Sequence, residues 1–471
     1  MPLTSTANRR GQASMEPCIL QHAKRTRTPS NHTLNDLPIE LLAAIISDVP
    51  EKQDLLSLSL TSRTLHAVAE EYLYSSFELY GASRINHISR KSLRPFLRTI
   101  IEIPRLRGLV KKVLIEPKPL DVPEPWLEEK PEITREYSRL FMDCCLALGY
   151  GTSREVEHWV NCLEENLEEA QVVLLLMLTQ NVMEADLWAP YLESCCGCPA
   201  PGVLGIVASL PDTKLFRGFH TLQNLSLDFC PYNWGSGPTL ETIARVICIP
   251  TLRRITLRKP TSWKTANLPC DWLPQASPVE ELRLISPYLG LEQWDTLLSS
   301  FRSLKVFISE WDYGALATSA LELSDIYRAL THQKLSLETI YLDTREIFSL
   351  DDYYFPLVPS AMGSLRDFEN LKNLTLTGTA MVGRSTGCYP RLSGTTIQSA
   401  EYLSELLPCS LQELTILDWI DGWPRRYFTA ELWTAAASLP HFANLRKIGM
   451  MNFLGKNKPP ELDEEYIIPG R

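Results

Sequence analysis

The sequence has no long uninterrupted run of apolar residues. Its densest apolar stretch, residues 172–178, is followed at once by Thr179, Gln180 and Asn181, whereas a helix that crosses a bilayer needs about 20 consecutive apolar residues. We therefore expect no membrane as a partner. The basic residues near the N-terminus have no apolar core after them, so we expect no secretory signal and a location in the cytoplasm, the nucleus or both.

An excess of positive charge is also missing. The formal net charge of the 471 residues is -10 at pH 7, which disfavours a chain-wide attraction to nucleic acid or to anionic lipid. We therefore expect no nucleic-acid partner. The content of 45% hydrophobic and 22% charged residues is typical of a soluble globular protein, and the length exceeds that of one typical domain.

The motifs of common enzymes are absent from the sequence. Gly235 and Gly237 precede Pro238, which marks a turn, whereas a phosphate-binding loop would end in Lys and Ser or Thr. There is no GxSxG nucleophile motif, and the eight histidines are scattered rather than placed beside a nucleophile or an acid. We therefore expect no catalytic residue and no enzyme activity. An active site assembled from distant repeats is the alternative.

The cysteines lack the spacing of a metal site. Twelve are present, and in a reducing compartment they are expected to be free thiols. Three lie within residues 195–198, and Cys144, Cys145 and His158 lie upstream, but neither group has the paired CxxC or HxxxH spacing of a structural zinc site. We expect buried or loop thiols, and neither a metal nor another cofactor.

Residues 35–77 show three short helical patterns in succession. Pro38 suits the first turn of a helix, and Asn35 before it can cap free backbone donors. Pro50 ends the first pattern and Asp54 begins the second. The third pattern places its apolar residues on one stripe, made of Leu65, Val68, Ala69, Tyr72 and Leu73. Such a small unit leaves a hydrophobic face uncovered, so it looks like one half of an interface.

The opening LPxELLxxI and the following DLLxLSLTSR are similar to an F-box. This resemblance implies that the segment docks to a Skp-type adaptor, which links the chain to a cullin ubiquitin ligase. One departure is visible, because Leu65 stands where the family commonly has Trp. The alternative is an ordinary three-helix piece of a larger core. By the resemblance, the adaptor-binding residues are Leu37, Pro38, Leu41, Leu42, Ile45, Leu55, Leu58 and Leu65.

An apolar signature with the spacing i, i+3, i+5 recurs along the rest of the chain. The matching sets are Val110, Val113, Ile115; Val182, Ala185, Leu187; Leu222, Leu225, Leu227; Leu252, Ile255, Leu257; Val279, Leu282, Leu284; Phe301, Leu304, Val306; Leu337, Ile340, Leu342; Leu371, Leu374, Leu376; Leu411, Leu414, Ile416; and Leu445, Ile448, Met450. Each set predicts a short strand with one buried face, and helix-like stretches separate the sets. Strand and helix in alternation indicate a solenoid with a mean period of about 32 residues.

This pattern resembles leucine-rich repeats, although a regular Asn or Cys ladder after the strands is absent. Together, the two parts resemble the F-box proteins with leucine-rich-repeat-like regions that are abundant in filamentous fungi. We predict a mixed α+β and α/β fold, in which a three-helix F-box at 33–78 precedes an irregular solenoid at 79–455. The polar residues 1–32 are expected to be a disordered tail, and residues 456–471 a mobile acidic tail.

Aromatic residues follow some of the predicted strands and fill one long connection. They are candidates for a substrate-binding rim, because Trp and Tyr are effective anchors in protein interfaces; the alternative is that they cap the uneven core. The candidates are Trp311, Tyr313, Tyr353, Tyr354, Trp419 and Trp423.

By the resemblance, we expect a substrate-recognition subunit of a Skp, cullin and F-box ubiquitin ligase, with a protein substrate bound by the repeats. A scaffold that binds the adaptor without sending a partner for degradation is the alternative.

Overall fold

Two units make up the chain, Met1–Leu73 and Tyr74–Arg471. The structure is a computed structural model. It describes residues 34, 37–79, 93–115, 135–148, 153–165, 168–189, 220–229, 240–260, 274–311, 323–345, 361–382, 400–417, 434, 436, 438–452 and 461–467. The apolar side chains buried in these residues form two separate clusters, one in each unit.

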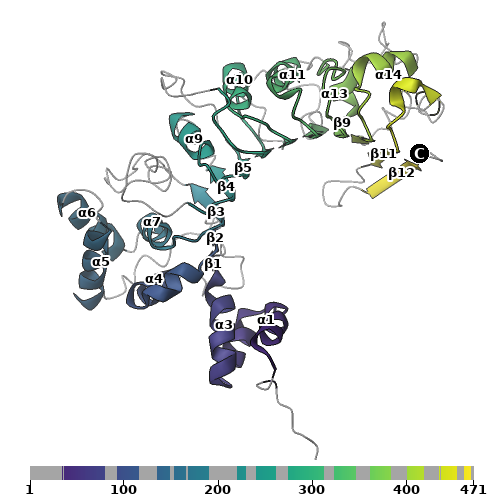
Figure 1. The fold of residues 1–471 in the computed structure, drawn as a ribbon. Helices are drawn as coiled ribbons and strands as arrows, with labels where there is room; N and C mark the ends of the chain where they lie inside the picture. The colour runs from purple at the N-terminus through teal and green to yellow at the C-terminus, as the bar shows by residue number, and fades with distance from the viewer. Residues whose placement is uncertain are drawn as a thin grey trace, which may run out of the picture. The chain divides into compact units, whose positions relative to one another are not determined.

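The first unit contains three helices, as the helical patterns predict. They are α1 (Ile39–Ser47), α2 (Lys52–Ser59) and α3 (Arg63–Ser75), the last of which continues past the unit's final residue (Figure 1). Their buried faces meet in one cluster of Leu42, Ile46, Leu55, Leu65, Val68 and Ala69. The Tyr72 hydroxyl donates a hydrogen bond to the Ala43 carbonyl at 3.1 Å, so α3 is fixed against α1 by a polar contact as well as by apolar packing.

The second unit is built on one sheet whose described strands follow each other in sequence order. Neighbouring strands are parallel from β1 to β11, and β12 pairs antiparallel with β11. The strands are β1 (Ser76–Leu79), β2 (Lys112–Ile115), β3 (Glu184–Ala189), β4 (Asn224–Phe229), β5 (Arg254–Arg258), β6 (Glu281–Ile285), β7 (Val306–Glu310), β8 (Thr339–Asp343), β9 (Asn373–Thr377), β10 (Glu413–Leu417), β11 (Lys447–Asn452) and β12 (Glu461–Ile467).

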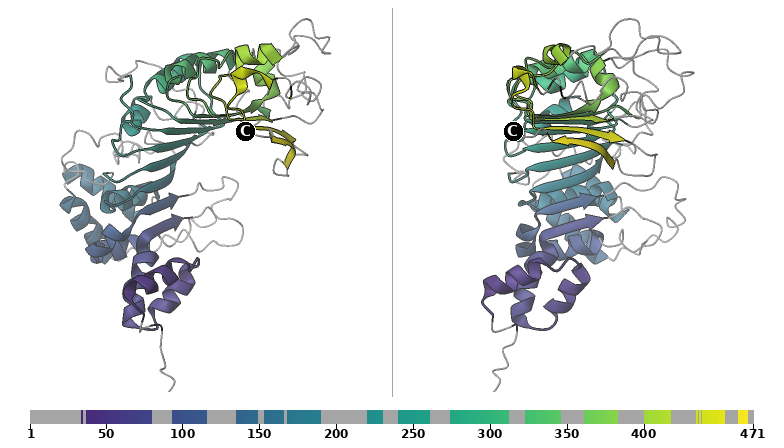
Figure 2. Two further views of the ribbon diagram at one scale, coloured as in Figure 1. Left: turned by 45° about the vertical axis from the view of Figure 1, so that its right-hand side comes forward. Right: turned by 90° about the vertical axis from the view of Figure 1, so that its right-hand side faces the viewer.

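The labelled helices of this unit lie on the same side of the sheet (Figures 1 and 2). The α-helices are α4 (Leu93–Glu102), α5 (Arg135–Ala147), α6 (Ser153–Glu164), α7 (Glu168–Leu178), α9 (Leu240–Ile247), α10 (Leu291–Ser299), α11 (Leu323–Leu330), α13 (Gly378–Val382) and α14 (Ala400–Leu406). Short 3-10 helices are η3 (Pro104–Leu109), η4 (Thr331–Gln333) and η6 (Pro440–Phe442). A parallel sheet whose strands alternate with helices fits an α/β solenoid.

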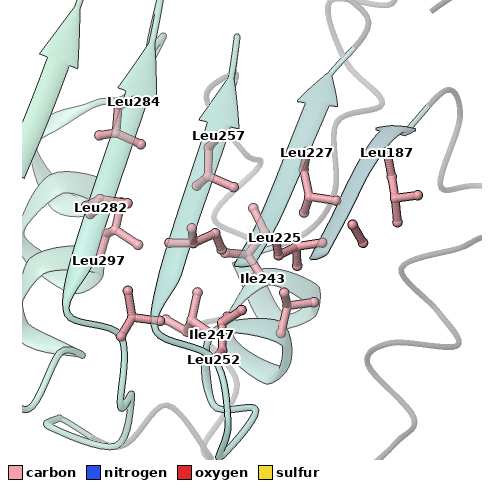
Figure 3. Close-up of a cluster of buried hydrophobic side chains, with 14 of the residues drawn as sticks. Leu187, Leu225, Leu227, Ile243, Ile247, Leu252, Leu257, Leu282, Leu284 and Leu297 are labelled. Atoms are coloured by element: carbon pink, nitrogen blue, oxygen red, sulfur yellow. The ribbon is translucent and has the colours of Figure 1, made fainter. Parts of the chain in front are cut away.

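The register explains the recurring signature. It aligns Leu187, Leu227, Leu257 and Leu284 on four neighbouring strands, and each of these side chains is at most 1% exposed. Figure 3 shows them on the same face as the side chains of α9 and α10. Full burial of one leucine contributes about 1.5–3 kcal/mol, so the aligned leucines hold neighbouring coils together.

The structure corrects the signature at β7. The spacing predicts a buried set of Phe301, Leu304 and Val306. The register instead pairs Leu282 with Phe307, and Leu304 and Phe307 are fully buried whereas Val306 is half-buried. The apolar spacing matches the sequence three residues too early, because Phe301 is itself apolar and buried. Phe301 forms an isolated bridge with Ser277.

The sheet begins earlier than the signature predicts. β1 continues directly from α3 and pairs in parallel with β2, with Phe77 opposite Val113 and Leu79 opposite Ile115. The expected boundary between residues 78 and 79 therefore falls inside a strand. The missed signal is Tyr74, which stands three residues before Phe77 and so begins a set with the same spacing.

The sheet also extends further than expected. Residues 461–467, which the sequence places in a mobile acidic tail, form β12 and pair with β11 from Lys447 to Asn452. The physical reason is that an edge strand carries free amide and carbonyl groups, which a following segment can satisfy by turning back. This part of the tail prediction is therefore corrected.

Three asparagine side chains each link two neighbouring coils, at the turns that precede the strands. The side chains of Asn181, Asn370 and Asn444 donate to the carbonyls of Gly108, Leu335 and Cys409 at 2.8, 2.7 and 3.0 Å. Each asparagine lies four residues before the first buried residue of its strand, and each carbonyl belongs to the preceding coil. We call these three bonds the asparagine ladder. They lie before the strands and join three separate pairs of neighbouring coils, so they do not form a continuous row.

Candidate functional site

Large apolar side chains are exposed on the first unit. We call Ile39, Leu41, Ile45, Leu56 and Leu60 the exposed apolar surface; their exposed fractions are 58, 52, 47, 43 and 79%. Leu34, which precedes α1, is 51% exposed. Several large apolar side chains exposed together on one small unit are typical of a protein interface.

The helical period places these residues outward. Leu41 and Ile45 are four residues apart on α1 and share a face, while their neighbours Leu42 and Ile46 are at most 2% exposed. Adjacent leucines in the middle of α2 differ in the same way, since Leu56 is exposed and Leu55 is buried. Each helix therefore has an apolar inner face and an apolar outer face, and only the inner face is used within the unit.

Acidic side chains are exposed on the same elements as the exposed apolar surface, together with the basic Lys52. Glu40, Asp48, Glu51 and Asp54 are exposed on α1, on α2 and in the turn between them. An apolar centre with a polar rim is the usual organisation of a protein interface. The rim here favours a partner that carries basic groups at the edge of its own apolar patch.

The structure places the predicted adaptor-binding residues in two classes. Pro38, Leu41 and Ile45 are exposed, and Leu37 and Leu58 are half-buried. The other three predicted residues are core residues and are corrected here: Leu42, Leu55 and Leu65 are 1, 5 and 6% exposed. Their side chains pack against each other within the unit, so they cannot also contact a partner.

Three surface residues were missed by the sequence prediction: Ile39, Leu56 and Leu60. The available signal was the position of each on the helix, since Leu56 immediately follows the inward Leu55 and Leu60 lies one turn beyond Leu56. Leucine is the expected residue in both faces, so composition alone does not separate them.

Trp311 lies in the core and not on a rim. It is 4% exposed, and its ring centroid is 6.2 Å from that of Trp294 on α10. Its backbone N–H donates to the Asp343 carbonyl at 3.0 Å, which extends the strand pairing by one residue and keeps the indole on the same side as Phe307. The rim assignment of Trp311 is corrected. The other rim candidates lie outside the described residues: Tyr313, Tyr353, Tyr354, Trp419 and Trp423.

The thiols of α5, Cys144 and Cys145, are buried. Burial raises the pKa of Cys145 to about 12, with a smaller contribution from Cys144, and burial also raises the pKa of Cys144. Within the described part of the chain, no three His, Cys, Asp or Glu side chains are grouped to hold a metal. Cys195, Cys196 and Cys198 lie outside that part.

None of the helices in the described ranges has the length and apolar character needed to span a membrane.

Comparison with known families agrees with the first unit. Residues 34–79 match the F-box-like family, and the match runs from the residues before α1 to the end of β1. No curated protein matches the sequence. The chain therefore carries an F-box-like domain, and its three N-terminal helices fit that domain.

Proposed function

We propose that the chain is the substrate-recognition subunit of a ubiquitin ligase of the Skp, cullin and F-box type. The observation that carries this proposal is the exposed apolar surface on a domain that matches the F-box-like family. F-box domains typically bind Skp-type adaptors, and the adaptor in turn binds the cullin.

The exposed apolar surface supplies the contact with the adaptor. Leu41 and Ile45 are each about half exposed, and full burial of one such side chain contributes roughly 1.5–3 kcal/mol to an interface, before the cost of association is subtracted. Leu60, at 79% exposed, has the most surface left to bury. These residues form the apolar centre of the interface, and the acidic rim fixes its orientation.

The second unit, in this proposal, holds the protein that is to be modified. The described helices of the second unit cover one side of its sheet and leave the other side uncovered by helices (Figure 2). Solenoids commonly use such extended surfaces for binding. The chain itself performs no bond chemistry. It acts by tethering: a partner held on the second unit experiences a high effective concentration of the ubiquitin carrier that the cullin recruits.

A double substitution on α1 tests the adaptor contact. We expect Leu41→Asp with Ile45→Asp to abolish co-purification with a Skp-type adaptor, because two carboxylates would have to be buried in an apolar interface. The matched control is Leu335→Asp, since Leu335 is 59% exposed but lies in the second unit. Adaptor binding that survives the double substitution, in a chain whose far-UV circular dichroism is unchanged, would refute the proposal.

The ligase role has its own test. Proteins captured by the full chain should be ubiquitinated in a reconstituted reaction with adaptor, cullin and ubiquitin carrier, and the Leu41→Asp, Ile45→Asp chain should capture them without supporting their modification. If the captured proteins bind but are not modified even by the unchanged chain, the protein is instead a scaffold on the adaptor.

A further inference from the structure

The side of the sheet opposite the helices carries charge in bands. Residues alternate along each strand, so those between the buried positions point to this side. On this side β3 and β4 carry acidic residues, and β7 and β8 carry acidic residues again. Between them, β5 and β6 carry three arginines and one glutamate, Glu281, which pairs with Arg254 at 3.2 Å. We call this set the banded face: Asp186 and Asp228, Arg258 and Arg283, Glu310 and Asp343.

Ion pairs between the bands fix these side chains. Arg258 Nη1 lies 3.0 and 3.2 Å from the two carboxylate oxygens of Asp186, and Arg283 Nη2 lies 2.8 Å from Glu310 Oε1. The Arg258, Arg283 and Glu310 side chains remain 36, 43 and 32% exposed. Partly exposed pairs of this kind contribute only about 0–1 kcal/mol each, so a ligand can compete for both partners.

Unused hydrogen-bonding capacity lies in the middle of the banded face. The register aligns Ser226, Thr256 and Arg283 across three strands. Within the described residues, neither Ser226 Oγ nor Arg283 Nε has a hydrogen-bond partner, although both atoms are buried. A ligand does not reach these two buried atoms, but the Arg283 side chain is 43% exposed and its guanidinium has five N–H donors. The exposed part of Arg283 can therefore donate to an incoming carboxylate while its bond to Glu310 remains.

Asp228, in the first acidic band, is half-buried. Burial raises the pKa of Asp228, while the nearby cations of Lys259 and Arg258 act in the opposite direction. In the other acidic band Asp343 is paired with Arg345 and Glu310 with Arg283, and Glu310 is the more exposed of the two carboxylates, at 32% against 15%.

Apolar side chains lie between the charged ones. Ile285 on β6, Ile308 on β7 and Tyr341 on β8 are half-buried on the same side of the sheet. They offer flat contacts for an apolar ring such as that of proline. The banded face therefore combines fixed charges of alternating sign with apolar ground between them, which is the composition of a specific peptide-binding surface.

We propose that the banded face binds an extended segment of a partner protein in which an acidic residue is flanked on both sides by basic residues, each three positions away. The band centres are two strands apart, or roughly 10 Å. A polyproline II segment rises about 3.1 Å per residue and returns to the same face every three residues, so its side chains match this spacing. The inference rests on the proposed function, because this segment would belong to the recruited partner.

A pair of peptides with one composition tests the order of charges. The probe is KPPEPPK, and its control is KPPKPPE, which has the same residues and net charge in the wrong order. We expect the full chain to bind labelled KPPEPPK about tenfold more tightly than KPPKPPE in fluorescence anisotropy, with the affinity falling as salt is raised. Equal affinity for the two peptides, or no binding of either, would overturn the proposal.

Charge reversal on the protein supplies the second arm. Arg258→Glu with Arg283→Glu should remove the preference for KPPEPPK and create binding to KPPKPPK, because the central band would become acidic. The matched control is Arg302→Glu with Arg328→Glu, which makes the same charge change at exposed positions outside the banded face. An unchanged preference in the first variant would contradict the proposal.

Adaptor binding is measured in parallel on each of these variants. It should be unaffected by the arginine substitutions, because the exposed apolar surface lies on the first unit. An unchanged peptide preference with intact adaptor binding would show that the banded face is wrong while the adaptor contact stands. Loss of the peptide preference in a chain that never binds the adaptor would show the reverse.

Discussion

Individual thiols in this chain differ in reactivity because they differ in burial. Cys145 is fully buried on α5 whereas Cys409 is exposed. Since the thiolate is the reactive form, a pKa of about 12 for Cys145 leaves about one thiol in ten thousand ionised at pH 8.

We therefore expect iodoacetamide at pH 8 to alkylate Cys409 well before Cys145, with mass spectrometry to locate the label. In denaturant the two cysteines should react at similar rates, which serves as the control. Rapid native labelling of Cys145 would show that α5 opens or is packed differently.

Position on a helix decides the role of each leucine in the F-box-like domain. Leu41 and Leu42 are adjacent and chemically identical, yet one is 52% and the other 1% exposed. The sequence motif predicts that both matter but cannot assign one to the partner and the other to the core. Helical period resolves the assignment only once the inward stripe is known, and the inward stripe is fixed by contacts with α2 and α3.

At the scale of elements, the asparagine ladder makes a testable contribution to stability. Asn370 Nδ2 donates to the Leu335 carbonyl at 2.7 Å and so connects two coils. We expect Asn370→Ala to lower the free energy of unfolding by about 1 kcal/mol, the typical net contribution of one hydrogen bond. Urea unfolding measures this change.

The matched control for that ladder position is Asn373→Ala. Asn373 is the first residue of the strand that follows Asn370, but the hydrogen bond from its side chain to the Thr339 hydroxyl is longer, at 3.3 Å. We therefore expect Asn373→Ala to lower the free energy of unfolding by less than Asn370→Ala does. Equal effects at the two positions would mean that the ladder bond has no special role.

Most strands of the sheet could be predicted from the sequence, because two buried positions three and five residues after an apolar residue leave a clear trace. β7 shows the limit of this signal. Ser309 occupies a fully buried position that holds Leu, Ile or Met on the other strands from β1 to β11, so the apolar spacing matches the sequence three residues too early. β12 shows another limit, since an acidic segment forms a strand only because a free edge is beside it.

At the scale of the whole molecule, the two units have separate cores, and their stabilities should respond separately to substitution. We expect Leu42→Ala to reduce amide protection in α1 to α3 while leaving β4 to β9 protected, because Leu42 belongs to the cluster of the first unit. A cavity of this kind costs about 2–5 kcal/mol, which is large for a unit of three helices.

Leu282→Ala is the reciprocal substitution, since Leu282 is 0% exposed in the cluster of the second unit. It should reduce protection in the sheet and spare α1 to α3. Hydrogen exchange followed by mass spectrometry reads both variants in one experiment. Parallel loss of protection in the two units for either variant would contradict separate cores.

The F-box-like domain could be predicted from the sequence because residues 34–79 carry the pattern of that family. The second unit offers no such guide. Its core signature is similar from coil to coil because it is repeated for packing, whereas the banded face changes from acidic to basic and back to acidic across the sheet. This arrangement becomes apparent only from the strand register and from the ion pairs that join Arg258 to Asp186 and Arg283 to Glu310.

The reversed direction of β12 also constrains how such a protein can change in length over evolution. A new coil appended after β11 would need the backbone groups that β12 already pairs with. Gene duplication can therefore lengthen the array by copying a coil between existing ones, and selection would retain β12 as a fixed terminus. Related proteins of different size should then vary in the number of internal coils and share the antiparallel strand.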